Sequence, residues 1–583
     1  MPDPYRLVTS PTPVSGPLRL STLSALVSID ALLRRARADG RRTEWAATAL
    51  AGGLDEQRAV EQELARRGTD RATLGRRAFV DEVRRFEVHH RARVQHQLDR
   101  LGIGLPARRG RTDSAAATKA ARTAFVRLYD EGLLERAERV QSECPRCQTV
   151  VDRLDCEPVE LEGEQLLVRL PYDDGDGDLI VSVAAPELLP GAVAVAVPEG
   201  HEGADRSVGL PIGGASVPVV TDPARELPEP VVPAHDADDH ELARALGLVP
   251  VEVLDGTGVV RAPGPLDGLA RYAARVAARE LFATFDALVA SGPILSAGQR
   301  CRRCGIVTVP RLGARWSLDL AALETTVAEQ VRQGALSFSD PADLEMLLER
   351  AGQTGPWCLS HQVWAGHPVP VSSCLDCGQL AVSVDPGESC GKCMGPLASE
   401  GDVLDARFVG ALWPLVSSGW PDYENGPADC APFTTVFVDR PGVAGWVLPM
   451  AALGLRLTGR IPFANVAVHP LSGLTTEDAS VPVELDGMLA GAGARVVRAA
   501  LAWAVAAGLE QPDLDVARAL VAAVDAPAEG DADIEVVVEG FRSCFSHGNP
   551  AAALVLLRAV LDDGVAPGSV ARLQALAAPI LGD

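Results

Sequence analysis

Four C-x-x-C pairs constrain the folding of this 583-residue chain more than any other feature. The pairs are Cys144/Cys147, Cys301/Cys304, Cys374/Cys377 and Cys390/Cys393. Each pair presents two thiolates from one tight turn, and a tetrahedral zinc site needs two such pairs. Because residues 1–19 contain prolines and no uninterrupted apolar core, we expect no secretory signal, and the pairing indicates metal binding rather than disulfides. The sequence therefore predicts two structural zinc sites, which have no open position for catalysis.

The pairs at 374–377 and 390–393 lie close together in the sequence. The loop that separates them contains Gly378, Pro386 and Gly387. This spacing predicts a zinc ribbon over residues 374–393, and the alternative is four free buried thiols.

The other two pairs lie at either end of a stretch rich in Val, Pro, Gly and Asp. Short strand-like runs at 166–170, 179–183 and 192–197 predict that this stretch is a β-rich inserted domain. If the chain enters and leaves this domain side by side, the four cysteines meet and staple its stem. Cys156 is a competing ligand candidate.

Composition excludes some classes of protein. Apolar residues make up 47% of the chain and mean hydropathy is +0.10, so the chain is not disordered. A net charge of −24 argues against a protein that mainly coats nucleic acid, although residues 1–142 carry a net charge of +8. The most apolar uncharged stretch, Pro441–Leu455, is too short to span a bilayer, so we expect a cytoplasmic protein. Lys119 and Lys392 are the only lysines among 54 basic residues.

Hydrophobic periodicity predicts an α/β protein of four parts. Residues 1–142 contain a short strand followed by amphipathic helices. The β-rich insertion covers 143–305 and contains a predicted helix over 266–289. Residues 306–485 mix helices, loops and strands around the second cysteine group, and 486–583 is a run of Ala/Leu/Val helices.

Several segments resemble one family. Trp357–Pro370 (WCLSHQVWAGHPVP) resembles the W-C-I-S-R-Q-L-W-W-G-H-x-I-P element of class I aminoacyl-tRNA synthetases. Asp402–Leu415, followed by Gly419–Pro421, resembles D-V-L-D-T-W-F-S-S-A-L-W-P-F…G-W-P of the valyl-tRNA synthetases, and Pro233–Asp239 resembles P-A-H-D-x-x-D of their editing domain. The resemblance runs from about residue 5 to about 525. It implies a Rossmann-type core split by a zinc-stapled, β-rich editing insertion, with a C-terminal helical remnant of the anticodon-binding domain.

Departures from the family pattern concern the groups that activate the amino acid. The family's HIGH motif falls on Arg19, Leu20, Ser21 and Thr22, which include no histidine. The KMSKS loop falls on residues 479–483, which include no lysine, and the G-T-D-H-A-G segment on 49–53 has lost its Asp and His. The Thr-Trp of D-V-L-D-T-W has become Ala406-Arg407. Because these groups stabilise the charged transition state, their loss implies that ATP is not used, with Arg19 left as a group that could neutralise a phosphate.

The editing motifs are also eroded. T-T-R-P-E-T has become residues 183–188, which keep Pro186 and Glu187, and G-T-G-A-V-K has become 225–230. His235, Asp236 and Asp239 remain, and together they could orient a water molecule for hydrolysis. The alternative, which we favour, is that they form a remnant turn or helix cap.

These observations favour a degenerate, truncated paralogue that acts as a binding or regulatory protein. One alternative is an active ligase that activates valine with ATP through an atypical site, and another is an editing-type aminoacyl-tRNA hydrolase. Residues 484–583 are acidic and follow the KMSKS position where the family continues with anticodon-binding helices, so tRNA is a weakened partner. No membrane contact is expected, and the sequence indicates no particular protein partner.

Overall fold

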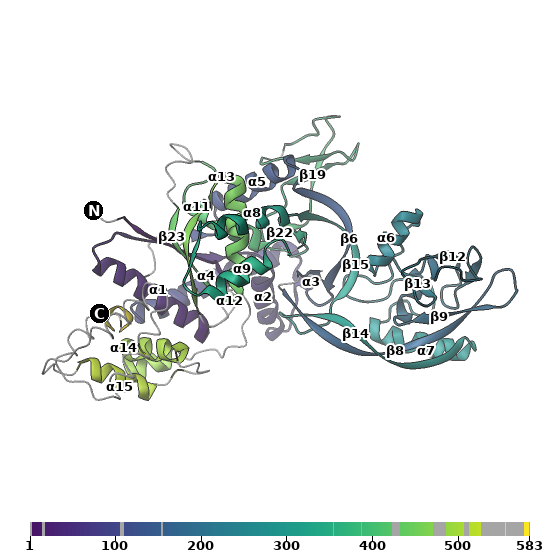
Figure 1. Ribbon diagram of the computed structural model, residues 1–583, viewed down its shortest axis with the longest axis horizontal. Coiled ribbons are helices and arrows are strands. Elements are labelled where there is room, and N and C mark those ends of the chain that lie inside the picture. Colours follow the sequence, from purple (N-terminus) through teal and green to yellow (C-terminus); the bar gives the residue numbers. More distant parts are fainter. Residues whose placement is uncertain are drawn as a thin grey trace. The chain divides into compact units, whose positions relative to one another are not determined.

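The structure is a computed structural model of the chain (Figure 1). It describes residues 3–13, 18–104, 110–152, 155–353, 355–385, 387–422, 432–469, 485–506, 512, 514–525, 554 and 577–581. The chain forms two compact units. Unit 1 comprises Met1–Leu134, Leu318–Leu359 and Val363–Asp583, and unit 2 comprises Glu135–Ser317 with Ser360–Gln362.

A parallel five-stranded sheet forms the centre of unit 1. Its order is β16 (Ser337–Phe338), β24 (Phe463–His469), β23 (Phe433–Asp439), β1 (Tyr5–Thr9) and β3 (Thr43–Ala46). The chain passes from β1 to β3 on one side and from β23 to β24 on the other, so the strand order reverses between β1 and β23. In open parallel sheets, ligands bind at the carboxyl ends of the strands beside such a reversal. This sheet confirms the predicted α/β class.

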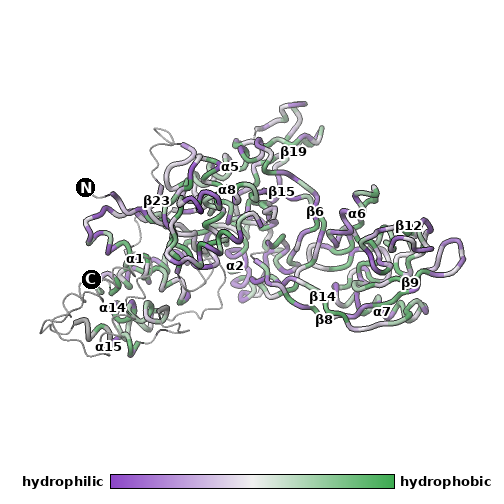
Figure 2. The backbone as a smooth tube through the Cα atoms, in the orientation of Figure 1, coloured by the Kyte–Doolittle hydropathy of each residue, from purple (hydrophilic) through white to green (hydrophobic). Residues whose placement is uncertain are grey.

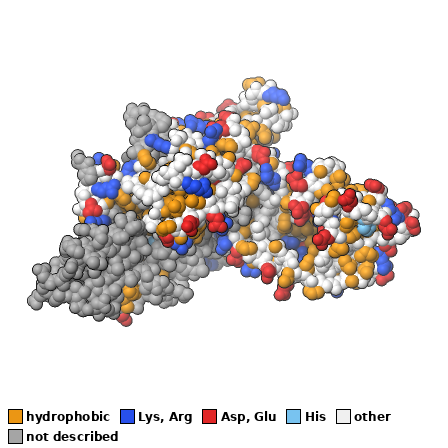
Figure 3. All heavy atoms as spheres, in the orientation of Figure 1, with side chains coloured by type: hydrophobic (Ala, Val, Ile, Leu, Met, Phe, Trp, Pro, Cys, Tyr) orange, Lys and Arg blue, Asp and Glu red, His pale blue; other side chains and the backbone are white. Residues whose placement is uncertain are grey.

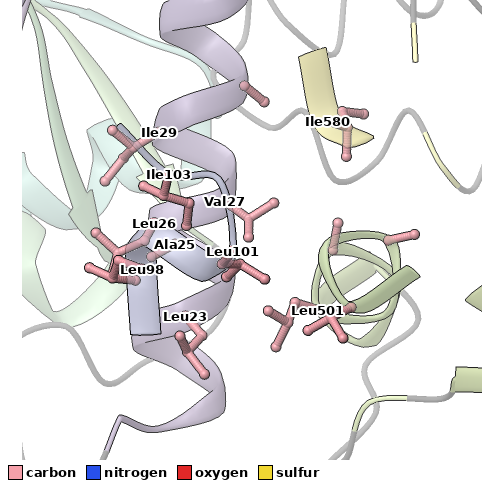
Figure 4. Close-up of a cluster of buried hydrophobic side chains, with 14 of the residues drawn as sticks. Leu23, Ala25, Leu26, Val27, Ile29, Leu98, Leu101, Ile103, Leu501 and Ile580 are labelled. Carbon is pink, nitrogen blue, oxygen red and sulfur yellow. The ribbon is translucent and has the colours of Figure 1, made fainter. Parts of the chain in front are cut away.

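Helix α1 (Leu20–Ala38) connects β1 to β3 and is buried along most of its length. No glycine or proline interrupts it, and it ends where Gly40 takes a positive φ of 76°. Its apolar residues, including Leu23 and Leu26, form a core with Leu98 and Leu501 (Figure 4). This cluster joins α1 to segments far along the sequence.

Helices α2, α4, α5, α8 and α9 lie where hydrophobic periodicity predicts helices, whereas α3 and α10 to α13 were not predicted and α14 begins earlier than expected. The helical run expected over 486–583 includes a predicted helix at 549–562, which lies outside the described residues apart from Leu554. The observed helices are α2 (Leu54–Arg66), α3 (Arg71–Leu74), α4 (Arg76–Arg100), α5 (Ala115–Asp130), α8 (Ala321–Arg332), α9 (Pro341–Arg350), α10 (Ala406–Ala411), α11 (Trp413–Ser417), α12 (Arg440–Gly442), a π-turn η4 (Val443–Val447), α13 (Leu448–Thr458), α14 (Leu485–Ala506) and α15 (Leu514–Asp525).

Short strands complete unit 1. A second parallel sheet contains β2 (Thr12–Pro13), β4 (Thr48–Leu50) and β5 (Gly110–Arg111). An antiparallel sheet contains β19 (Val371–Cys374), β20 (Leu380–Val382) and β21 (Leu397–Ser399). Strands β17 (Trp357–Cys358) and β22 (Val403–Leu404) lie on either side of it in the sequence.

Unit 2 is rich in β-structure, as the short strand-like runs predict. The long strands β8 (Cys156–Pro171) and β14 (Leu288–Cys301) pair antiparallel as far as Cys156 opposite Cys301, and β9 (Asp178–Val183) pairs with β8. A four-stranded sheet has the order β11 (Ser207–Gly209), β12 (Ser216–Thr221), β10 (Ala194–Val197) and β13 (Glu229–Val231). The other elements are β6 (Leu134–Cys144), β7 (Thr149–Val150), η2 (Pro186–Gly191), α6 (Ala237–Leu246), α7 (Arg271–Thr284), β15 (Val309–Leu318) and β18 (Ser360–His361).

One predicted element of unit 2 is wrong at both ends. The helix expected over 266–289 spans only Arg271–Thr284 as α7. Leu266 packs in the core of unit 2 ahead of the helix, and from Leu288 onward the chain pairs with β8 as strand β14. Ladder pairing with a distant strand has therefore overridden the local helical pattern.

Hydropathy follows these elements. Parts of α14, α7 and β8 are hydrophobic (Figure 2). No helix in the described part of the chain is long and apolar enough to cross a membrane. On the face shown in Figure 3, acidic, basic and apolar side chains alternate over the described surface.

Candidate functional sites

The first cysteine group lies in unit 2, where β6 and β14 end. We call Cys144, Cys147, Cys301 and Cys304 the stem cluster. Their sulfur atoms all lie within 4.8 Å of one another, and Cys144 Sγ is 3.3 Å from Cys304 Sγ. Hydrogen bonds from the Cys144 and Cys147 thiols lower the pKa values of both Cys301 and Cys304.

Cys156 lies outside the stem cluster. It is buried opposite Cys301 in the β8–β14 ladder, and burial raises the pKa of its thiol to about 12. The four sulfur atoms that lie close together do not include that of Cys156, so it is a buried side chain beside the four-cysteine group.

The second group lies in unit 1, around strands β19 to β21. We call Cys374, Cys377, Cys390 and Cys393 the loop cluster. The sulfur atoms of Cys374 and Cys393 are 3.4 Å apart, and those of Cys377 and Cys390 are 3.8 Å apart. Cys377 and Cys393 are exposed, unlike any member of the stem cluster. In each cluster, four thiols of this spacing are the donor set that zinc prefers, with no open coordination position.

The residues at the HIGH position form the start of α1. Arg19 is the N-cap in an extended conformation, and the helix begins at Leu20, soon after β1. Leu20 is 2% exposed and packs in the core, and Ser21 is fully buried. This turn, at the carboxyl end of the central sheet, therefore carries no imidazole and points apolar surface inward.

The neighbouring strand ends at the same edge carry polar residues with structural contacts. Asp439, at the end of β23, is fully buried and accepts a hydrogen bond of 2.9 Å from the Gly442 amide, which caps α12. His469, at the end of β24, is buried against the Phe437 ring at 6.0 Å.

The two lysines of the chain have other contacts. Lys119 Nζ lies 2.7 Å from Asp422 Oδ1 in an exposed ion pair, and Lys392 lies within the loop cluster, where its amide donates to Cys390 Sγ. The KMSKS position, 479–483, lies outside the described residues.

His235 in unit 2 uses both ring nitrogens structurally. Its Nδ1 lies 2.9 Å from the carbonyl oxygen of Pro310, and its Nε2 accepts a hydrogen bond of 3.0 Å from the Val253 amide. Burial lowers the pKa of this imidazole, so it stays neutral. Because both nitrogens have fixed partners, the ring has no free position from which to move a proton.

The two aspartates near His235 also have structural contacts. Asp236 is the N-cap of α6 and accepts from the Asp238 and Asp239 amides. Asp239 accepts from the Val232 amide at 2.7 Å and from the guanidinium of Arg225. Burial raises the pKa of Asp239 to about 6, although the Arg225 charge opposes this shift. These contacts are those of a helix cap and a buried ion pair.

Glu187, another residue kept from the editing motifs, also has structural contacts. It is fully buried in η2, where Arg271 Nε lies 3.0 Å away and Arg275 Nη2 lies 2.6 Å away. Two arginines of α7 thus hold this retained residue in place.

Two hollows open on unit 2. One of about 730 Å³ is lined by Arg225, Leu227 and several carboxylates, and one of about 670 Å³ is lined by Tyr172, Ser182 and Arg206, with Leu227 shared between them. Sequence reasoning did not find these hollows, because their walls combine strands, turns and helix α6 that are distant in sequence.

Sequence reasoning also missed Glu56, which lies at the third position of α2. A charged residue at the start of an amphipathic helix predicts a solvated face, yet Glu56 is 3% exposed. Its position three residues after the N-cap Gly53 is the available signal, because a glutamate there folds back onto the helix start.

The chain is similar in sequence to a known family of proteins. Residues 2–390 match the family model described as tRNA synthetases class I (I, L, M and V). The chain belongs to this family. It is 33% identical over 486 residues to a valine–tRNA ligase of Streptomyces coelicolor, and 31% identical over 481 residues to one of Carboxydothermus hydrogenoformans. Each alignment covers 80% of this chain, and the chain is therefore valyl-tRNA synthetase-like.

The synthetase-like chain spans only about half of these relatives, 54% and 55% of their respective lengths. A solved structure with a similar fold is a ternary complex of an Agrobacterium radiobacter K84 LeuRS with tRNA and LeuAMS. Its TM-score is 0.50 at 15% identity, with 99% of this chain and 84% of that chain covered. This likeness supports the class I α/β fold.

Proposed function

We propose that this chain is a valyl-tRNA synthetase-like protein that does not activate an amino acid and acts as a binding or regulatory protein. The observation that carries the proposal is the first turn of α1. Where the family resemblance places two histidines, the chain has Arg19 and Thr22, with Leu20 in the core between them.

The physical argument concerns the transition state of activation. In class I synthetases the amino-acid carboxylate attacks the α-phosphate of ATP, and preorganised cationic or hydrogen-bonding groups stabilise the developing charge. Removing one such donor costs about 10²–10³ in rate, so the loss of both histidines and of the lysine loop leaves little activity. Arg19 supplies one positive charge but no second donor.

Unit 2 is, in this proposal, a remnant of the editing domain. The contacts of His235 support this view, because a histidine with both nitrogens engaged is no general base. The hydrolase alternative predicts that mischarged tRNA decays faster with the protein than without it. We expect equal rates, and a clear acceleration that is lost in Asp239→Asn would support the hydrolase instead.

Both cysteine clusters are proposed to bind zinc structurally. The stem cluster would close the entry and exit of unit 2, and the loop cluster would form a zinc ribbon at residues 374–393. Because its net charge is −24, the chain should hold tRNA less firmly than a basic synthetase would. We also place the protein in the cytoplasm.

The decisive experiment is valine-dependent exchange of pyrophosphate into ATP. We expect no exchange above the blank with the purified full chain, while a bacterial valine–tRNA ligase assayed beside it exchanges strongly. Zinc content should be measured on the same sample, so that inactivity is not due to lost metal. Valine-dependent exchange by the metal-loaded chain would refute the proposal.

A further inference from the structure

The loop cluster differs from the stem cluster in how far its sulfur atoms are open to solvent. Cys377 and Cys393, the second cysteine of each C-x-x-C turn, are exposed. The first cysteines, Cys374 and Cys390, are buried. The stem cluster contains no exposed cysteine, since three of its members are buried and Cys304 is intermediate. Small solutes can therefore reach two thiols of the loop cluster directly.

The two exposed thiols also lie close to each other. Cys393 Sγ is 3.4 Å from Cys377 Sγ, which belongs to the other turn. Cys393 Sγ is also 3.4 Å from the buried Cys374 Sγ, and Cys377 Sγ is 3.8 Å from the buried Cys390 Sγ. Whichever exposed thiol is oxidised first, the other exposed thiol is only 3.4 Å away. The pair Cys377/Cys393 is thus the disulfide that both starting points favour.

Main-chain hydrogen bonds join the two turns independently of the sulfur atoms. The Leu375 amide donates to the Pro396 carbonyl at 3.0 Å, which ties the first turn to the chain after the second. Strand β19 pairs with β21, with Cys374 opposite Leu397 at the end of the ladder. Because these contacts do not involve a metal ligand atom, the turns should stay together when the metal is lost. The two exposed thiols can then join with little movement of the chain.

We propose that Cys377 and Cys393 are a modification site, at which a peroxide joins them as a disulfide and the metal of the loop cluster is lost. The thiolate form of cysteine is both the metal ligand and the nucleophile that peroxides oxidise, so an exposed pair of ligands is susceptible. The stem cluster offers the same thiols in a buried setting and is protected. This inference goes beyond the proposed binding function and rests on the proposed zinc binding of the loop cluster.

The reaction balances with hydrogen peroxide as the oxidant. The Cys393 sulfur attacks one peroxide oxygen, the O–O bond breaks, and hydroxide leaves with the bonding electrons, which gives a sulfenic acid. The Cys377 thiolate then attacks this sulfur, and a second hydroxide leaves as the S–S bond forms. Each sulfur has lost one electron and the peroxide has gained two, and two protons from the buffer convert the hydroxides to water. Cys374 and Cys390 remain as two thiolates, too few for a tetrahedral zinc site.

Peroxide treatment of the full chain tests this directly. Hydrogen peroxide is raised until Met394, which is 74% exposed beside Cys393, becomes the sulfoxide, so that the oxidant has reached this surface. The protein is then desalted for metal analysis and mapped by mass spectrometry without reduction. We expect the zinc content to fall from two ions per chain to one, with a disulfide between Cys377 and Cys393 and none in the stem cluster. Dithiothreitol with added zinc should restore the lost ion, because a disulfide is reversible.

Variants separate the thiol pair from the metal site. Cys393→His keeps four zinc ligands, since three cysteines and one histidine form a common zinc site, but it lacks one sulfur of the pair. It should carry two zinc ions and lose the loop-cluster ion to peroxide about tenfold more slowly than the unaltered chain. Met394→Leu, which removes the neighbouring oxidisable sulfur and no thiol, is the matched control. Its zinc loss and its disulfide should equal those of the unaltered chain.

Three results would overturn the inference: two zinc ions kept after Met394 is oxidised, zinc lost without the Cys377–Cys393 disulfide, or equally fast zinc loss in Cys393→His. The mapping uses the unaltered chain, so the inference can fail even if a variant does not fold. A purified chain that holds no zinc in the loop cluster overturns both the inference and the proposed zinc ribbon. Pyrophosphate exchange with valine removes the proposed binding function and leaves the peroxide result to be judged by itself.

Discussion

The stem cluster and the loop cluster each offer four cysteine thiols, but their surroundings differ. The stem cluster joins thiols as far as 160 positions apart in sequence, whereas the loop cluster joins thiols 19 positions apart. Closing the longer loop restricts the unfolded chain by about 2 kcal/mol more, because closure entropy grows with the logarithm of loop length. Identical thiolate chemistry can thus hold a whole unit together in one place and shape a single loop in another.

The largest effect should come from Cys301→Ser in the stem cluster. Losing one ligand should release the metal and lower the free energy of unfolding of unit 2 on the order of 5 kcal/mol, since metal binding there is coupled to folding. Metal content should fall from two ions per chain to one. Differential scanning calorimetry and limited proteolysis at residues 135–317 measure the change.

The control for this variant is the unaltered chain after metal depletion. Depleted protein and the serine variant should show the same early cleavage within unit 2. If Cys301→Ser melts at the unaltered temperature, the stem cluster does not hold unit 2 together.

A smaller effect is expected from Cys377→Ser in the loop cluster. One metal should again be lost, but the unfolding free energy of the rest of unit 1 should fall by only about 1–2 kcal/mol, since the closed loop is short. The comparison needs both variants at equal metal loading. An effect as large as that of Cys301→Ser would mean that loop length does not distinguish the clusters.

The two clusters should also release metal at different rates. Cys377 and Cys393 are exposed, whereas Cys144, Cys147 and Cys301 are buried, so a chelator reaches the loop cluster first. A chromogenic chelator should show two phases of one ion each. Cys377→Ser should lack the fast phase and Cys301→Ser the slow phase, and a single phase in the unaltered chain would contradict this order.

The smallest effect is expected from Cys156→Ala. Because Cys156 is outside the four-sulfur group, metal content should stay at two ions per chain, and the loss of one buried sulfur should cost about 1 kcal/mol. Metal analysis of the variant tests this prediction, because the loss of one ion would show that Cys156 is a ligand.

Local patterns predicted the parts of the fold that depend on local chemistry. The C-x-x-C turns and the long amphipathic helices depend on residues three or four positions apart, so their types are readable from the sequence. Helix α7 was overestimated because the residues from Leu288 onward are paired by β8, more than a hundred positions away.

The candidate sites were harder to predict for the same reason. The role of His235 depends on main-chain groups of Pro310 and Val253, which no motif links to it. Burial raises the pKa of Glu56 to about 8, and the charges of Glu87 and Asp113, which are not its neighbours in sequence, add to this shift. Retained residue identity therefore does not establish a retained role.

A buried arginine in α14 sets an order of events during synthesis. Arg498 is 1% exposed, pairs with Asp30 of α1 at 2.7 Å, and donates to the carbonyls of Pro579 and Ile580. At ribosomal rates Asp30 emerges roughly half a minute or more before Arg498. Unit 2 is complete long before then. The nascent chain should therefore carry a folded insertion while the core around α1 still waits for its last strands and helices.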